Sequence, residues 1–225
     1  MKQINLIILA IGIFFLAASC SKDDPTPEED QEEVGTAKLV FTEVEREAHG
    51  DHYHYNDIQN AEVEEVEFGG DGMLPPVGAH LHLHVGKTYR LELFSTDFAS
   101  RETRQTFLDR ADIHQAFILK DPAESLEGTL EYVYADRDAD GNRVGDVGVT
   151  GYLTVVEEAD TFVLRYVLRH LNPGVKENIT AEDWSNPNFT QFTGANDLDL
   201  KVEVHLVDDD HGHDDDDDHD HDHDH

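Results

Sequence analysis

The chain of 225 residues contains one cysteine, Cys20, and only 16 lysine and arginine residues against 50 aspartate and glutamate residues. A single cysteine excludes an internal disulfide, and a mature domain beyond Cys20 has no thiolate ligand to offer a metal. The formal net charge of −34 repels nucleic acid and attracts cations. Any metal site in the folded part must therefore be built from imidazole and oxygen ligands, and nucleic acid is not an expected partner.

The N-terminus lacks an apolar run of transmembrane length. Lys2 precedes a stretch from Ile4 to Ala18 that is apolar except for Asn5, and this stretch is too short to cross a bilayer and then stop. The pattern predicts a signal peptide over residues 1–19, and therefore a protein that leaves the cytoplasm.

The residues that follow indicate a lipid anchor. Leu16 to Cys20 (LAASC) resembles a bacterial lipobox, which implies cleavage before Cys20 and acylation of its thiol. Ser21 to Asp24 (SKDD) resembles the signal that sends Bacteroidetes lipoproteins to the outer face of the outer membrane. The alternative is an acidic linker on a lipoprotein that faces the periplasm. Either way we expect two-chain anchoring in the outer membrane, with an acidic linker over residues 20–35.

Residues 36–207 are expected to form one domain in which the hydrophobic pattern has a period of two. Ser100 to Ile113 alone has helical character. Gly86-Lys87 and Glu158-Ala159-Asp160 are predicted turns between antiparallel neighbours. The fold class expected from this pattern is all-β, an antiparallel β-sandwich with one short helical connection. The predicted strands are Lys38 to Glu47, Ala61 to Phe68, His80 to Val85, Thr88 to Ser95, Gln115 to Lys120, Gly128 to Ala135, Val147 to Glu157, Thr161 to His170 and Leu198 to Val207.

The first candidate metal motif is HGDHYH, in which His49, His52 and His54 surround Gly50. Three imidazoles at this spacing can converge from a turn on one tetrahedral ion and leave a fourth position open. With Tyr55 the string closely resembles the zinc-binding motif of the histidine-triad surface proteins of Gram-positive cocci, which are implicated in extracellular zinc scavenging. The resemblance covers seven residues, occurs once, and implies a ligand set without implying the architecture of that family.

The second motif is His80-Leu81-His82-Leu83-His84-Val85. On a strand it places His80, His82 and His84 on one face and the apolar residues on the other. Two of these imidazoles can reach one zinc ion, so a further ligand is needed from a neighbouring strand or from the first motif. The string also resembles the signature of the histidine-triad nucleotide hydrolases. Gly86 stands at its last apolar position and no phosphate-binding glycine-rich loop is visible, so nucleotide hydrolysis is not expected.

A third motif resembles the opening of a calcium loop. Asp136, Asp138 and Asp140 alternate before Gly141, but the twelfth position is Val147, which excludes an EF-hand. The alternatives are a looser calcium site on the three aspartates and a polar hairpin loop, of which the loop is preferred.

Three histidines stand singly: His114, His170 and His205. A structural role in or beside the core is the usual outcome for such residues, although any of them can complete a metal site. His114 is the favoured candidate because it lies in a polar run between the helical stretch and a strand.

The last segment, residues 208–225, consists of aspartate and histidine except for Gly212. Without apolar side chains it is predicted to be disordered and to bind metal ions loosely. Its candidate ligands are His211, His213, His219, His221, His223 and His225.

Together these patterns favour a protein that binds a transition metal outside the cytoplasm. Imidazole with carboxylate suits zinc, nickel and copper(II), and metal availability would select zinc. Capture of the ion, with delivery to an outer-membrane importer, is the expected role. A structural or adhesive surface domain with an incidental histidine-rich tail is the alternative, and a zinc hydrolase is the third reading. We expect no enzyme, because no His-Glu-x-x-His or comparable constellation is present.

Overall fold

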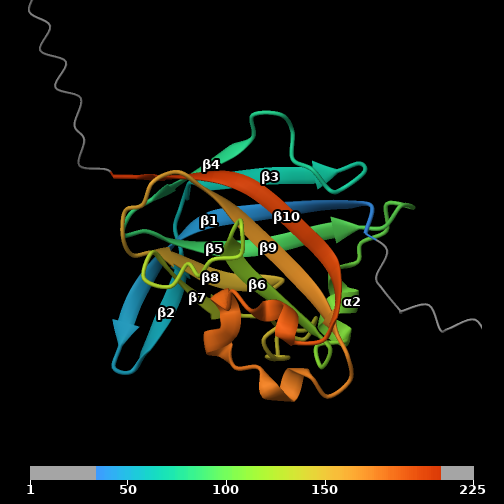
Figure 1. Ribbon diagram of the computed structural model, residues 1–225. Helices are drawn as coiled ribbons and strands as arrows, with labels where there is room; N and C mark the ends of the chain where they lie inside the picture. The colour runs from blue at the N-terminus through green and yellow to red at the C-terminus, as the bar shows by residue number, and fades with distance from the viewer. Residues whose placement is uncertain (1–33, 209–225) are drawn as a thin grey trace, which may run out of the picture. The chain divides into compact units, whose positions relative to one another are not determined.

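The computed structural model describes residues 34–208, in which the strands run from Thr36 to Val207. Cys20 and the histidines of the last segment lie outside the described residues. Within this range the chain forms two β-sheets that pack face to face, with a short helix at one end (Figure 1). No helix in residues 34–208 is long and apolar enough to cross a membrane.

The larger sheet has six strands in the order β2-β1-β5-β8-β7, and β3 pairs with the first half of β1. All its pairs are antiparallel. Its strands are β1 (Thr36–His49), β2 (His52–Asp57), β3 (Val63–Gly69), β5 (Thr88–Thr96), β7 (Leu130–Tyr134) and β8 (Thr150–Val155).

The smaller sheet has the order β4-β10-β9-β6 and crosses in front of β1 and β5 in the view of Figure 1. Its edge strand β4 runs parallel to β10, whereas the other pairs are antiparallel. Its strands are β4 (His80–His84), β6 (His114–Lys120), β9 (Phe162–Leu171) and β10 (Gly194–Val207).

The main core lies between the sheets, where alternate residues such as Leu39, Leu91, Leu81 and Leu164 are fully buried. The outer face of the smaller sheet is also covered at β6. There Phe117, Leu119, Val167 and Phe189 form a second cluster. The segment after β9, with the 3₁₀ turns η2 (Lys176–Asn178), η3 (Ala181–Ser185) and η4 (Phe189–Gln191), supplies part of this cover. Burial on both faces explains why β6 reads as a continuous apolar run rather than an alternating one.

The predicted β-sandwich and its nine strands are confirmed, with boundary shifts of a few residues. The prediction of antiparallel neighbours at the two turns was wrong. Gly86-Lys87 joins β4 to β5, and Glu158-Asp160 joins β8 to β9; each turn carries the chain from one sheet to the other. Among the strand pairs of residues 34–208, β4–β10 departs from the expected antiparallel arrangement, because these two strands are parallel.

Two further elements differ from expectation. The predicted helix over Ser100 to Ile113 shortens to α2 (Arg104–Asp109), whose Phe107 and Leu108 are buried. Strand β2 was not predicted, because its sequence HYHYND has no buried residue and only Tyr55 is partly covered. A strand without a core-facing side leaves no hydrophobic alternation to detect.

Candidate metal centre

The ends of two core strands bring His114 and His170 together. In the β6–β9 pair these residues lie directly opposite each other. His114 is two residues from Ala116, which belongs to the main core, so both imidazoles lie on the inner side of the smaller sheet. Their ring centroids are 4.8 Å apart with the rings nearly perpendicular. The antiparallel register, rather than a short sequence spacing, therefore creates this pair.

A β-bulge supplies the third group, Asp197. The register of β10 against β9 shifts between Asn196 and Leu198, so Asp197 is the extra residue. A bulge of this kind re-aims a side chain that regular alternation would place elsewhere. Gly194 permits the close approach of the strands here, because a Cβ atom at this position would lie 2.1 Å from the carbonyl oxygen of His170.

The three side chains form the one group in the described part of the chain whose metal-ligating atoms all lie within 4.8 Å of one another. Asp197 Oδ2 lies 3.2 Å from His114 Nε2 and 3.9 Å from His170 Nδ1. Two atoms bound to one tetrahedral zinc at about 2.0–2.2 Å are themselves about 3.3–3.5 Å apart. This His/His/Asp group could therefore bind a metal ion with small adjustments of its side chains.

The hydrogen bonding of His114 fits a metal ligand. Its Nδ1 lies 3.0 Å from the carbonyl oxygen of Arg110, which can only accept, so Nδ1 carries the proton. In the neutral ring Nε2 then carries a lone pair, and this nitrogen is the one that lies near Asp197. His114 Nε2 forms no hydrogen bond with the described residues. Metal-bound histidines characteristically donate the other ring N–H to a carbonyl or carboxylate in this way.

Burial separates this group from the other histidines. The side chains of His114 and Asp197 are fully buried, and that of His170 is 16% exposed. The Phe107 ring of α2 packs against the His114 ring in a T-shaped arrangement, with the two ring centroids 5.2 Å apart. Two imidazoles and one carboxylate with little competing water suit zinc and other divalent transition metals, and they leave a coordination position for a further ligand.

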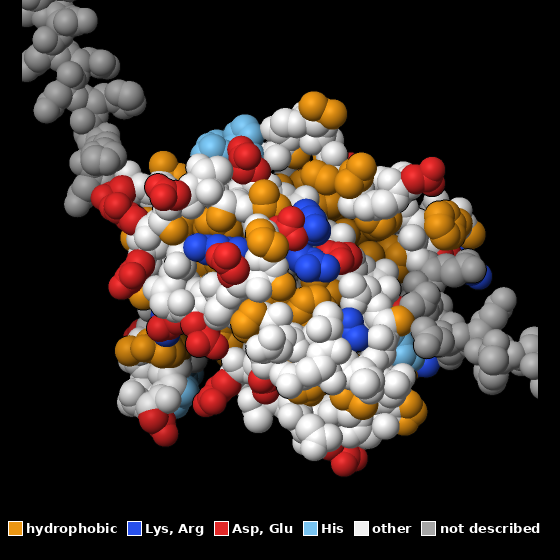
Figure 2. Space-filling model, viewed as in Figure 1, with side chains coloured by type: hydrophobic (Ala, Val, Ile, Leu, Met, Phe, Trp, Pro, Cys, Tyr) orange, Lys and Arg blue, Asp and Glu red, His pale blue; other side chains and the backbone are white. Residues whose placement is uncertain are grey.

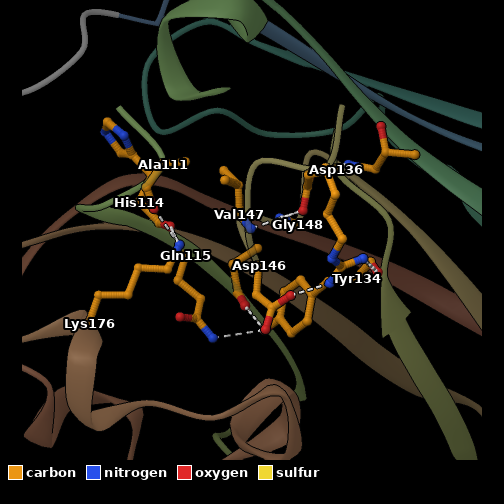
Figure 3. A network of polar contacts seen from close by, with 12 residues as sticks. Ala111, His114, Gln115, Tyr134, Asp136, Asp146, Val147, Gly148 and Lys176 are labelled. Atoms are coloured by element: carbon orange, nitrogen blue, oxygen red, sulfur yellow. Dashed lines mark hydrogen bonds and ion pairs between the residues drawn. The ribbon is translucent and has the colours of Figure 1, made fainter. Parts of the chain in front are cut away.

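Lys176 holds the backbone on either side of the start of β6, where His114 lies. Lys176 Nζ donates to the carbonyl oxygens of Ala111 and His114, 2.6 and 2.5 Å away (Figure 3). Burial lowers the pKa of Lys176 to about 8. On the next residue, Gln115 donates to the hydroxyl of Tyr134, which in turn donates to Ala116 O. These contacts hold the backbone at the start of β6, which carries His114.

Two aspartates of the calcium-like motif, Asp136 and Asp138, use their carboxylates to accept backbone hydrogen bonds. Asp136 is buried and its carboxylate accepts the backbone N–H groups of Val147, Gly148 and Thr150 at 2.7–2.9 Å. Asp138 accepts the backbone N–H groups of Asp140 and Asn142 within its own turn. The three aspartates do not form a group of possible metal ligands in residues 34–208, and calcium binding by them stays a prediction. The loop interpretation describes what they do.

The HGDHYH motif forms the tip of the β1–β2 hairpin. His49 and His52 are paired across a two-residue turn in which Gly50 has a φ of 65°. Glu47 pairs with His54, so all four side chains share one face of the hairpin. The ring centroids of the three histidines are 4.5–6.3 Å apart, and His52 Nε2 lies 3.1 Å from His54 Nε2. The structure thus brings the three predicted ligands together at an exposed site.

The three histidines of the second motif have different surroundings. In β4 Leu81 and Leu83 are fully buried while His80 and His82 are exposed, as the alternation predicts. His205 of β10 lies opposite His82. His84 is instead partly covered, and its Nε2 lies 3.5 Å from a carboxylate oxygen of Glu62.

Sequence reasoning named His114 as a ligand but did not include His170 or Asp197 in the predicted set. The sequence allows His170 to complete a site, and only the strand register shows which site. Asp197 carries no recognisable signal, because a bulge cannot be read from the local sequence Gly194 to Leu198. Comparisons of the chain with protein-family models, with curated proteins and with solved structures found no match.

Proposed function

We propose that this protein is a lipid-anchored metal-binding protein that captures zinc, or a similar divalent transition metal, outside the cytoplasm. The observation that carries the proposal is the buried group of His114, His170 and Asp197, with ligand atoms within 4.8 Å of one another. Two imidazoles and one carboxylate that are shielded from water form a ligand set that suits a divalent transition metal.

The exposed histidines support a capture role. The hairpin tip presents three imidazoles and Glu47 to solvent, whereas the buried group is shielded from it. Exposed ligands exchange ions readily, and a buried site holds an ion against competing water. Lipid attachment at Cys20 and delivery of the ion to an outer-membrane importer complete the proposal, and both rest on the sequence patterns alone. No catalytic role is proposed.

The test is a calorimetric zinc titration of the full chain and of a full-chain variant with the six tail histidines from His211 to His225 replaced by asparagine. We expect the variant to bind fewer ions but to keep the buried centre as a tight site, and Asp197→Asn in the same background to remove that centre. Retention of no site tighter than about 10 μM, or about −6.8 kcal/mol, would contradict metal capture by the folded domain.

A further inference from the structure

The outer face of the β4–β10 pair carries a second set of ligands that is separate from the buried group. Because these strands are parallel and in register, Glu203 lies beside His80, and His205 lies beside His82. Residues two apart on a strand share a face, so the four side chains form a block of two by two on the outside of the smaller sheet. The inner positions between them, Leu81 and Val204, are fully buried.

The rings are close enough to share one ion. The centroids of His80 and His82 are 4.8 Å apart, and that of His205 lies 5.2 Å from His80 and 5.4 Å from His82. His80 Nδ1 donates to Gly78 O at 2.9 Å, so Nε2 of the neutral ring has an available lone pair. Glu203 Oε1 lies 2.9 Å from His205 Nε2, so a carboxylate lies beside one of the three imidazoles. Exposed side chains on a fixed backbone can turn toward an ion without displacing core residues.

The structure also separates the third histidine of the strand from this block. His84 lies beside Val207, not beside a ligand, and its ring faces Glu62, which immediately precedes β3. One ion cannot take all three imidazoles of an extended strand, because His80 and His84 are about 13 Å apart along it. A cross-strand ligand is therefore the one that can complete a site with His80 and His82.

Acidic groups surround the block. Glu64 of β3 approaches the backbone N–H of His82, with Oε2 3.5 Å from the nitrogen, and Glu203 belongs to the block itself. Figure 2 shows histidine side chains gathered at the surface over β4, with acidic side chains beside them. Negative charge at a ligand cluster favours a cation and disfavours an anionic ligand such as a phosphate.

The geometry points to a second metal site on this face, in which His80, His82 and His205 bind one zinc ion and Glu203 is the fourth ligand. Three imidazoles and one carboxylate fill a tetrahedral zinc site. The site shares no residue with the buried group and is open to solvent, so it loads and unloads independently. It rests on the proposed function only for the identity of the metal.

The test reads each histidine separately in the full chain. Diethyl pyrocarbonate modifies accessible neutral imidazoles, and mass spectrometry assigns the modification to individual residues. We expect zinc to suppress modification of His80, His82 and His205 with one common midpoint. In His205→Ala the midpoint for His80 and His82 should rise at least about tenfold, because one ligand is lost. His84→Ala is the matched control, since it removes a histidine from the same strand, and it should leave that midpoint unchanged.

Two results would overturn the site. One is that zinc protects His80 and His82 in His205→Ala with the same midpoint zinc concentration as in the chain without substitutions. The other is no protection of the three residues as zinc is raised to about 100 μM, ten times a dissociation constant of about 10 μM. Circular dichroism of each variant establishes that the fold is kept. If zinc does not protect the three histidines but calorimetry still shows binding that depends on Asp197, the second site alone is refuted. If zinc protects them but no binding depends on Asp197, the buried centre alone is refuted.

Discussion

Replacement of Asp197 by asparagine distinguishes a metal centre from a buried ion pair. Asparagine has nearly the same shape as aspartate but no charge, so it removes the carboxylate while the bulge and its packing remain. If His114 is an imidazolium paired with Asp197, removal of one partner leaves a buried charge and costs about 3–5 kcal/mol of unfolding free energy. If the group instead holds a metal, the metal-free protein loses no such partner and is expected to keep or slightly gain stability.

The size of the metal effect follows from linkage. An ion at one hundred times its dissociation constant stabilises the folded state by about 2.7 kcal/mol. For a domain of this size, each kcal/mol shifts the unfolding temperature by roughly 2–4 °C. Zinc should therefore raise the unfolding temperature of the unmodified chain by about 5–11 °C through this centre, and Asp197→Asn should lose that increment.

The assay is scanning calorimetry of the full chain at about pH 8, above the ordinary imidazole pKa of about 6.5, with zinc or with a chelator. Asp112→Asn is the matched control, because Asp112 is exposed and lies two residues from His114. The control should keep both the stability in chelator and the gain with zinc. An equal loss of about 3–5 kcal/mol in chelator and in zinc for Asp197→Asn would show that the carboxylate serves an ion pair, and the metal reading of this group would be wrong.

Three other variants test the surrounding interpretation. Replacement of His52 and His54 by alanine should weaken zinc binding at the hairpin tip with a stability change within about 0.5 kcal/mol, measured by titration and urea unfolding, because both side chains are exposed. Leu83→Ala should do the reverse, with a loss of about 2–5 kcal/mol in urea unfolding and unchanged hairpin binding, because Leu83 is fully buried. Asp136→Asn should cost about 1–3 kcal/mol at neutral pH, because an amide group then faces one of the backbone N–H donors. Burial raises the pKa of Asp136 above 3.8, so this group makes the unfolding free energy fall as pH rises through the range just above 3.8, and the variant should lose that slope in urea unfolding at several pH values.

The sequence predicts the sandwich well because most of its strands have one face in the core. Leu81 and Leu83 alternate with exposed histidines, and alternation of this kind identifies both the strand and its inward face. The order of the strands is less accessible. His80–His84 and Thr88–Thr96 are joined by a tight turn that suggests a hairpin, yet they enter different sheets, because β4 pairs with the distant strand β10. Pairing across more than 100 residues leaves no local signal.

The same physics limits the prediction of ligands. His49, His52 and His54 lie within six residues, so a turn brings them together and the motif is visible in the sequence. His114, His170 and Asp197 come from three strands, and their meeting depends on the β6–β9 register and on a bulge in β10. Single histidines at strand ends look alike in a sequence, whether they pack as neutral core residues or bind a metal. Only long-range register distinguishes the two.

The positions of the three histidine groups also determine what a metal can do to the fold. The hairpin tip and the outer face of β4–β10 have solvent on one side, because their histidines are exposed or, for His205, half-buried. Zinc at these places ties together only adjacent strands, β1 with β2 or β4 with β10. The buried group instead ties together β6, β9 and β10 at the end of the core, next to Phe107 of α2. An ion there resists separation of three strands that are far apart in the chain, so occupancy of this centre should slow global unfolding, whereas occupancy of the exposed sites should protect chiefly the local backbone amides from hydrogen exchange.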